Sequence, residues 1–216
     1  VLAVGLSAIH KAHLAAALGL DTGRPVLVLT DDDNTANRFA ADLRGFSERD
    51  IVQLPSRELV MADVVGVSRG YEQRRLAALD ELTEAHFAVA SVQAAAQRTM
   101  PPEALKAAIV TLAAGETAPL DELAQSLTRA GYERCVQVEG TGQFSIRGGI
   151  LDVFPPQAEH PYRVEFWDDE IDSISTFDVG SQRRLEQCEC LRCLPCMESI
   201  PALAKGGAAG LAKAVL

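Results

Sequence analysis

Two residues near the start of the chain have the spacing of a phosphate-binding loop. In the pattern G-x-x-x-x-G-K-[ST], backbone N–H groups surround the phosphates, the lysine neutralises them and the hydroxyl holds Mg²⁺. Gly5 and Lys11 occupy the positions of the first glycine and the lysine, but His10 replaces the second glycine and Ala12 replaces the hydroxyl. We therefore interpret Gly5 and Lys11 as a degenerate remnant of that loop in an ordinary strand-to-helix turn, and we expect neither binding nor hydrolysis of ATP.

Metal binding is a second chemistry that the residue types allow. Four thiols lie within nine residues, at Cys188, Cys190, Cys193 and Cys196. C-x-x-C is a zinc spacing, but structural zinc usually draws two such pairs from separated segments, and a strand would place Cys193 on the opposite face from the first two. We expect free thiols and no metal, with a zinc-dependent module as the less favoured alternative. The adjacent carboxylates of residues 31–33 suit a helix-capping loop better than a cation site.

Arg147, Arg163 and Trp167 lie on the polar side of two alternating segments. Residues 143–147 read QFSIR and residues 162–167 read YRVEFW. Because successive side chains of a strand point to opposite faces, the even-numbered residues would face a core and the odd-numbered residues would face away from it. Arginine brings several donors and tryptophan a large apolar area, the composition of a protein-binding site. We expect these three residues to anchor a partner, and substitutions there to change stability by only about 0.5 kcal/mol. The alternative is that Trp167 folds under a neighbouring element and the arginines are merely solvated.

Composition excludes several classes of protein. A net charge of −10 argues against a free-standing nucleic-acid binder, because phosphate neutralisation dominates that kind of affinity. No apolar run reaches the roughly 18 residues that a membrane span needs, and five cysteines without a signal peptide suit a reducing cytoplasm. No catalytic carboxylate pair or Ser/His/Asp set is visible, and the four histidines have no ligand-like companions. We expect no catalytic residues and no cofactor.

The first half of the chain alternates between strands and helices. Strands are expected at residues 1–4, 25–30, 51–54 and 86–92, and helices after Gly5, at about 34–43 and at about 68–83. This order predicts an α/β domain with a parallel sheet covered by helices. Pro101-Pro102 should end that domain, and residues 103–106 should form a short connector.

The second half is predicted to be an α+β domain. Residues 109–113 suit a strand, residues 119–130 a helix ended by Gly131, and residues 132–138 another strand. Within residues 140–177, Gly148-Gly149 should mark a bulge or close backbone approach, and Pro155-Pro156 should end the next strand. Asp168-Asp169 should form a tight turn, which gives an antiparallel meander.

The strings RGGILDVFPP, HPYRVEFWDDEIDSISTFD and SQRRLE resemble the second domain of the bacterial transcription-repair coupling factors (Mfd), which is similar to a domain of the excision-repair helicase UvrB. The likeness is dense over residues 140–186 and thinner back to Val1. It implies that Arg147, Arg163 and Trp167 stand where this family contacts UvrA, Trp167 in place of a common phenylalanine. UvrB proteins also insert a tyrosine-rich DNA-clamping hairpin before the strand at 86–92, for which this chain has no room.

By this resemblance, residues 1–106 form a degenerate, P-loop-NTPase-like domain (domain 1A), residues 107–188 form the inserted UvrA-binding domain 2, and residues 189–216 begin a truncated return to domain 1B, with a helix from about Ala202. The module would recruit UvrA in transcription-coupled nucleotide excision repair without an ATPase activity of its own. The full-length protein would be an ATP-dependent DNA translocase that also engages RNA polymerase and DNA through domains outside this chain. The alternative is a nucleotide-dependent, UvrB-like helicase fragment that binds DNA and ATP.

Overall fold

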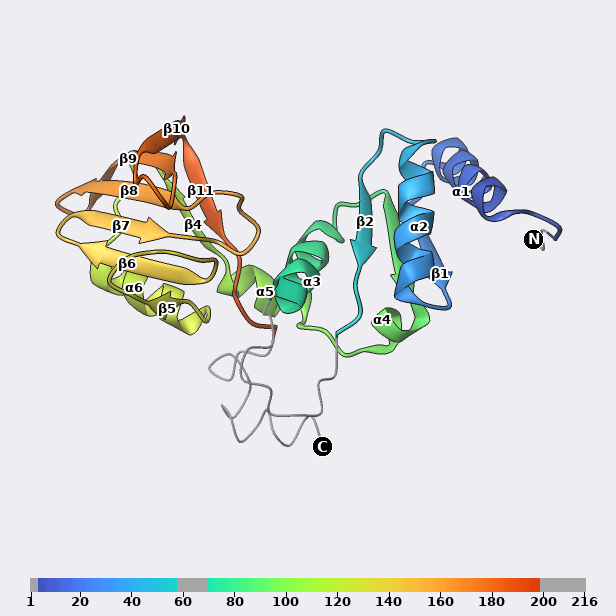
Figure 1. Cartoon of the computed structure of the whole chain (residues 1–216), viewed down its shortest axis with the longest axis horizontal. Coiled ribbons are helices and arrows are strands. Elements are labelled where there is room, and N and C mark those ends of the chain that lie inside the picture. Colours follow the sequence, from blue (N-terminus) through green and yellow to red (C-terminus); the bar gives the residue numbers. More distant parts are fainter. Residues whose placement is uncertain (1–3, 58–69, 199–216) are drawn as a thin grey trace. The chain divides into compact units, whose positions relative to one another are not determined.

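The computed structural model describes residues 4–57 and 70–198 of the chain, and these divide into two compact units (Figure 1). The first unit is Val1–Thr99 and the second is Met100–Leu216. Each unit has its own hydrophobic core, so each is described by itself.

The first unit is a parallel sheet with helices, as the alternating pattern predicts. Its elements are α1 (Ala8–Thr22), β1 (Val26–Thr30), α2 (Asp33–Arg44), β2 (Ile51–Leu54), α3 (Gly70–Glu81), β3 (Phe87–Ser91) and α4 (Val92–Ala96). The sheet order is β1-β3-β2, and both pairings are parallel. The strand expected at residues 1–4 falls almost wholly outside the described residues.

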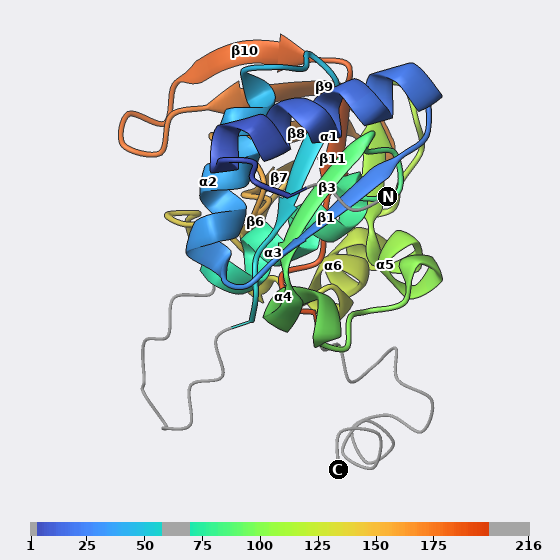
Figure 2. The ribbon, with the colours of Figure 1, turned by 90° about the vertical axis from the view of Figure 1, so that its right-hand side faces the viewer.

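The two sheet faces of the first unit pack against different helices. Phe87 and Val89 point to the face that α1 and α2 cover, where small residues such as Ala16 and Ala36 let the helices come close (Figure 2). A Cβ at Gly19 of α1 would stand 2.6 Å from the Phe87 ring, so glycine is required at this crossing. Val52, Leu54 and Ala90 point to the other face, where they pack with Ala78 of α3 and Ala94 of α4.

The second unit holds an antiparallel meander. Its elements are α5 (Pro102–Ala108), β4 (Val110–Ala113), α6 (Leu120–Arg129), β5 (Glu133–Arg134), β6 (Gln143–Arg147), β7 (Ile150–Val153), β8 (Tyr162–Trp167), β9 (Glu170–Phe177), β10 (Arg184–Cys188) and β11 (Cys190–Cys193). The main sheet has the order β10-β9-β8-β7-β6-β5, antiparallel except for the short β5–β6 pair. A separate two-stranded sheet joins β11 to β4.

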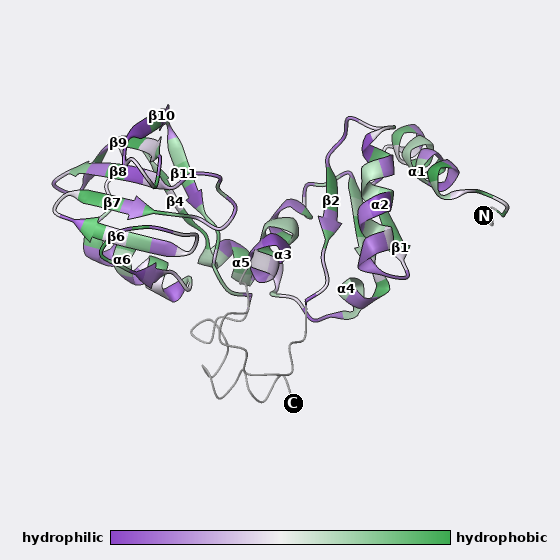
Figure 3. Cartoon of the chain, in the orientation of Figure 1, coloured by the Kyte–Doolittle hydropathy of each residue, from purple (hydrophilic) through white to green (hydrophobic). Residues whose placement is uncertain are grey.

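One face of the six-stranded sheet builds the core of the second unit. Phe144, Leu151, Val164 and Ile174 are fully buried there, against leucines of α6 and of the β4–β11 pair. Hydrophobic and hydrophilic residues alternate along these strands (Figure 3). The opposite face of β6 to β9 is therefore polar, as the period of two predicts.

Several local predictions are confirmed. β7 ends at Val153, just before Pro155-Pro156, and Asp168-Asp169 turns β8 into β9, with Asp168 at φ 58°. The close backbone approach expected at the glycine pair is also confirmed, since a Cβ at Gly149 would stand 3.0 Å from the backbone oxygen of Phe166. Gly148-Gly149 does not interrupt a strand but forms the two-residue turn of the β6–β7 hairpin, with Gly148 at φ 60°.

Other local predictions are wrong. The strand expected at 132–138 shrinks to β5: the Cys135 N–H still donates to the Phe144 backbone oxygen, but the Val136 oxygen accepts from the Ser145 hydroxyl instead of from a ladder partner. The connector expected at 103–106 lies in α5, which opens the second unit. Residues 190–193 do not leave that unit, since they form β11 on β4. The helix expected from Ala202 lies outside the described residues.

Candidate protein-docking surface

The candidate surface is the polar face of β6, β7, β8 and β9, which we call the docking face. Strand register brings Ser145, Asp152, Arg163 and Ser175 into one row across these four strands. Residues directly opposite each other on neighbouring strands have side chains close enough to interact. The row therefore places a carboxylate beside an arginine that lies eleven residues further along the chain.

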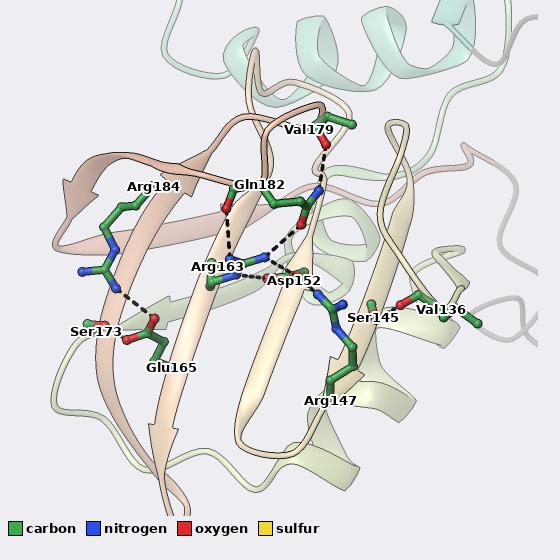
Figure 4. Close-up of polar contacts among 10 residues, drawn as sticks. All are labelled: Val136, Ser145, Arg147, Asp152, Arg163, Glu165, Ser173, Val179, Gln182 and Arg184. Atoms are coloured by element: carbon green, nitrogen blue, oxygen red, sulfur yellow. Dashed lines mark hydrogen bonds and ion pairs between the residues drawn. The ribbon is translucent and has the colours of Figure 1, made fainter.

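Asp152 is the centre of a shared ion-pair network (Figure 4). Its side chain accepts from Arg147 Nη2 at 2.8 Å, from Arg163 Nε at 2.7 Å and from Arg163 Nη2 at 2.8 Å. Only 1% of Asp152 is exposed. A carboxylate this deeply buried needs cationic donors, and the hydrogen bond to Asp152 in turn raises the pKa of Arg163 above its ordinary value.

Arg163 is held from other sides as well. Its Nη1 donates to the backbone oxygen of Gln182 at 3.5 Å and its Nη2 to Gln182 Oε1 at 3.2 Å. The guanidinium also lies 4.4 Å from the centre of the fully buried Phe177 ring. Its side chain is consequently only 19% exposed, less than strand alternation alone predicts.

The loop that reaches Arg163 is shaped by Asp178. The Asp178 carboxylate accepts from the N–H and the hydroxyl of Ser181, and these bonds lower the pKa of Asp178. Gln182 takes φ 60° and donates from Nε2 to the backbone oxygen of Val179. The loop thus presents both Gln182 oxygens to one guanidinium.

Arg147 and Trp167 differ from Arg163 in their exposure. The Arg147 side chain is 50% exposed, and Trp167 is 82% exposed where β8 meets its turn. The alternative in which Trp167 folds under a neighbouring element is therefore wrong for this structure. Of the three predicted anchors, the network joins Arg147 and Arg163 through Asp152, while Trp167 follows two positions beyond Glu165 on the same strand face.

Sequence reasoning missed several residues on the docking face and beside it. Asp152 and Gln182 complete the arginine network, and a second ion pair joins Glu165 to Arg184 at 2.9 Å, with Ser173 donating to Glu165. Asp152 lies in the otherwise apolar run ILDV, so the only sequence signal for an outward side chain was its position between two inward-facing residues of the strand. Gln182 had no sequence signal, because it arrives by a loop.

Gly5 and Lys11 both lie in the first unit. Gly5 takes φ 76° in the turn before α1, and Lys11 is exposed in the first turns of that helix. His10 accepts or donates at 3.0 Å to Ser7, the N-cap residue. These residues form a turn into α1, with the His10 side chain where a phosphate loop would have glycine.

The clustered cysteines have separate environments. Cys188 is half-buried, Cys190 is exposed, and Cys193 and Cys196 are buried. Burial raises the pKa of Cys193 to about 12. Over residues 4–57 and 70–198, no group of three or more His, Cys, Asp or Glu side chains is arranged to hold a metal. The carboxylates at 31–33 serve a helix, since Asp32 caps α2 by accepting from the Thr35 N–H at 2.6 Å.

Every helix in the part of the chain that the structure describes is too short or too polar to cross a membrane.

Comparison with known proteins first assigns a class to the unit that carries the docking face. Residues 110–198, from β4 to just beyond β11, match the family model of the UvrB interaction domain. The match includes every residue of the docking face named above.

The chain as a whole is similar to part of the transcription-repair-coupling factors. It is 34% identical over 203 residues to that of Bacillus subtilis (strain 168), across 92% of this chain and 17% of the relative. It is 36% identical over 189 residues to that of Mycobacterium tuberculosis (strain CDC 1551 / Oshkosh), across 83% and 15%. For Escherichia coli (strain K12) the identity is 32% over 189 residues, across 87% and 16%. The chain thus spans only about a sixth of the length of these relatives.

Proposed function

We propose that this chain is the UvrA-recruiting adaptor module of a transcription-repair coupling factor, acting in the cytoplasm in transcription-coupled nucleotide excision repair. The observation that carries the proposal is the docking face, where an exposed tryptophan and a half-exposed arginine stand beside a buried ion-pair framework. That face lies inside the residues that match the UvrB interaction domain.

The chemistry of the docking face favours an acidic and partly apolar partner surface. Arg147, Arg163 and Arg184 meet Asp152 and Glu165 in the two ion-pair groups, and Glu170 stands opposite Trp167 on β9. The half-exposed Arg147 is therefore the cation with the most freedom to meet an acidic group of a partner. Trp167 offers the large apolar area that anchors interfaces. UvrA would then supply carboxylates to Arg147 and an apolar pocket to Trp167.

The proposal assigns no ATPase activity to this module. The first unit is a degenerate relative of a P-loop NTPase domain, with His10 and Ala12 where the phosphate loop needs glycine and a hydroxyl. Translocation on DNA and contact with RNA polymerase would belong to parts of the full-length protein outside this chain. The competing function, a UvrB-like fragment that binds ATP and DNA, predicts saturable ATP binding in calorimetry that is lost in Lys11→Ala.

The test is the affinity of the chain for UvrA, measured by calorimetry with single variants. We expect Trp167→Ala and Arg147→Ala each to weaken binding by about thirtyfold, the effect of losing about 2 kcal/mol at an interface hot spot. Melting temperatures should stay near the original value, because both side chains are largely exposed.

Two matched variants control for loss of charge and loss of apolar surface. Arg129→Ala removes an exposed arginine that bonds only within α6, and Leu27→Ala removes an exposed apolar side chain from the first unit. Both should bind UvrA like the original chain. Absence of binding by the original chain, or equal binding by all four variants, would contradict the proposal.

A further inference from the structure

The two arginines bonded to Asp152 have different freedom to meet a partner. Every nitrogen of Arg163 already donates within the chain: Nε to Asp152, Nη1 to Gln182, and Nη2 to both. The same guanidinium lies over the Phe177 ring. These bonds engage four of the five N–H donors of Arg163, and its side chain is only 19% exposed, so little of its guanidinium is available to a partner.

Arg147 makes fewer hydrogen bonds within the chain than Arg163 and is more exposed. It donates to Asp152 through Nη2 alone, and its other N–H groups have no partner among the described residues. Its side chain is half exposed. A guanidinium has five N–H donors in a rigid fork, so a single anchoring bond leaves most of the fork available.

We propose that Asp152 is the positioning residue of the docking face and acts on a partner through Arg147, while Arg163 supports Asp152 from within the ion-pair network. This inference rests on the proposed function and adds a role for each charged residue. Asp152 holds one end of the Arg147 fork, so less rotamer freedom is lost when the partner binds. Arg163, fixed by Gln182 and Phe177, holds Asp152 in place.

The first experiment is a double-mutant cycle with Asp152→Asn and Arg147→Ala, read as the dissociation constant for UvrA. Asparagine keeps the shape of the side chain but removes the charge that orients Arg147. We expect Asp152→Asn to weaken binding roughly tenfold in the original chain and to have no further effect in the Arg147→Ala background. A purely structural role for Asp152 would weaken binding equally in both backgrounds, and that result would overturn the inference.

A second variant avoids leaving a buried arginine unpaired. Asp152→Leu combined with Arg163→Met replaces both partners of the buried pair by apolar groups of similar size, an exchange that is often close to neutral for stability. We expect this variant to melt near the original temperature and to lose roughly tenfold in affinity, again only while Arg147 is present. If the double variant binds UvrA with the affinity of the original chain, Asp152 does not position Arg147. If the double variant loses affinity even in the Arg147→Ala background, Arg163 itself contacts UvrA.

The outcomes separate this inference from the proposed function. If the original chain does not bind UvrA, the proposed function fails. If it binds but the cycle shows no coupling between Asp152 and Arg147, only the assignment of roles fails. Arg129→Ala again serves as the control for removing one positive charge away from the docking face.

Discussion

At the scale of single residues, burial separates side chains that the sequence makes look alike. Asp152 is charged and almost wholly covered, and breaking such a pair from one side typically costs about 3–5 kcal/mol because the remaining charge stays buried. Substitution of Arg163 should therefore reduce stability, contrary to the small effect that a solvent-facing arginine predicts. Loss of Arg147 removes one half-exposed partner and leaves Asp152 paired with Arg163.

The cysteines also differ in burial, and this difference predicts which of them react. A thiolate is the reacting form, so the exposed Cys190 should react with a disulfide reagent at pH 8 much faster than Cys193, whose pKa burial raises to about 12. We expect one fast phase in the absorbance of the released thiol, and reaction of the buried Cys193 and Cys196 only after denaturant unfolds the chain.

Two serine variants identify the thiol responsible for that phase. Cys190→Ser should remove the fast phase, and Cys193→Ser should leave its amplitude and rate unchanged. A fast phase that survives Cys190→Ser and disappears with Cys193→Ser would contradict the burial that the structure shows.

At the scale of elements, single residues at the ends of helices and strands determine where each element begins and turns. Asp32 starts α2 by accepting from Thr35, and Gly148 supplies the positive φ that the β6–β7 turn needs. Both contacts are local in the sequence. The cap of α2 is also a feature that local reasoning predicted, from the carboxylates at residues 31–33.

The cap of α2 makes a pH-dependent contribution to stability. The hydrogen bonds from Thr35 lower the pKa of Asp32 from its ordinary value of 3.8, so the folded chain favours the ionised form. This contribution is fully present above the ordinary value and is lost as the pH falls through the lowered pKa of the folded state. Asp32→Asn keeps a cap acceptor that does not titrate.

The measurement is the difference between the melting temperatures of the original chain and Asp32→Asn. We expect this difference to be constant above about pH 5 and to shift against the original chain as the pH falls below the ordinary pKa of aspartate. Other acidic groups cancel in this difference. Asp31→Asn, next to the N-cap but outside it, is the matched control for the loss of one carboxylate. A difference that stays constant down to pH 2 would rule out the capping role.

At the scale of the whole molecule, the chain consists of two units with separate cores. The core of the second unit draws on α6, the six-stranded sheet and the β4–β11 pair, all within residues 110–193. The docking face lies on the opposite side of that sheet. Folding of this unit and presentation of the docking face should therefore not depend on the first unit.

This arrangement predicts the behaviour of the separated units. A fragment of residues 100–216 should unfold in one cooperative transition and bind UvrA within about threefold of the affinity of the whole chain, a change of less than 1 kcal/mol. Circular dichroism and calorimetry provide the two measurements. A fragment of residues 1–99 is the control and should not bind. Loss of binding in a folded 100–216 fragment would place part of the docking site in the first unit.

The sequence by itself determined the features that depend on local pattern. Alternation in residues 143–147 and 162–167 placed Arg147, Arg163 and Trp167 on one sheet face, and the turn at Asp168-Asp169 followed from residue type. Helices α1, α2 and α6 and the parallel sheet of the first unit followed from periodicity and order. These features rest on contacts between residues that are near one another in the chain.

Only the tertiary structure decided which partners those side chains have. Arg163 meets Asp152 because β7 pairs with β8 in one register, and it meets Gln182 because a loop nineteen residues away folds onto the same face. Cys193 is buried because β11 pairs with β4, a strand that lies some eighty residues earlier in the chain. Register and loop packing are set by the whole core at once, so no local pattern could separate the framework arginine from the exposed one.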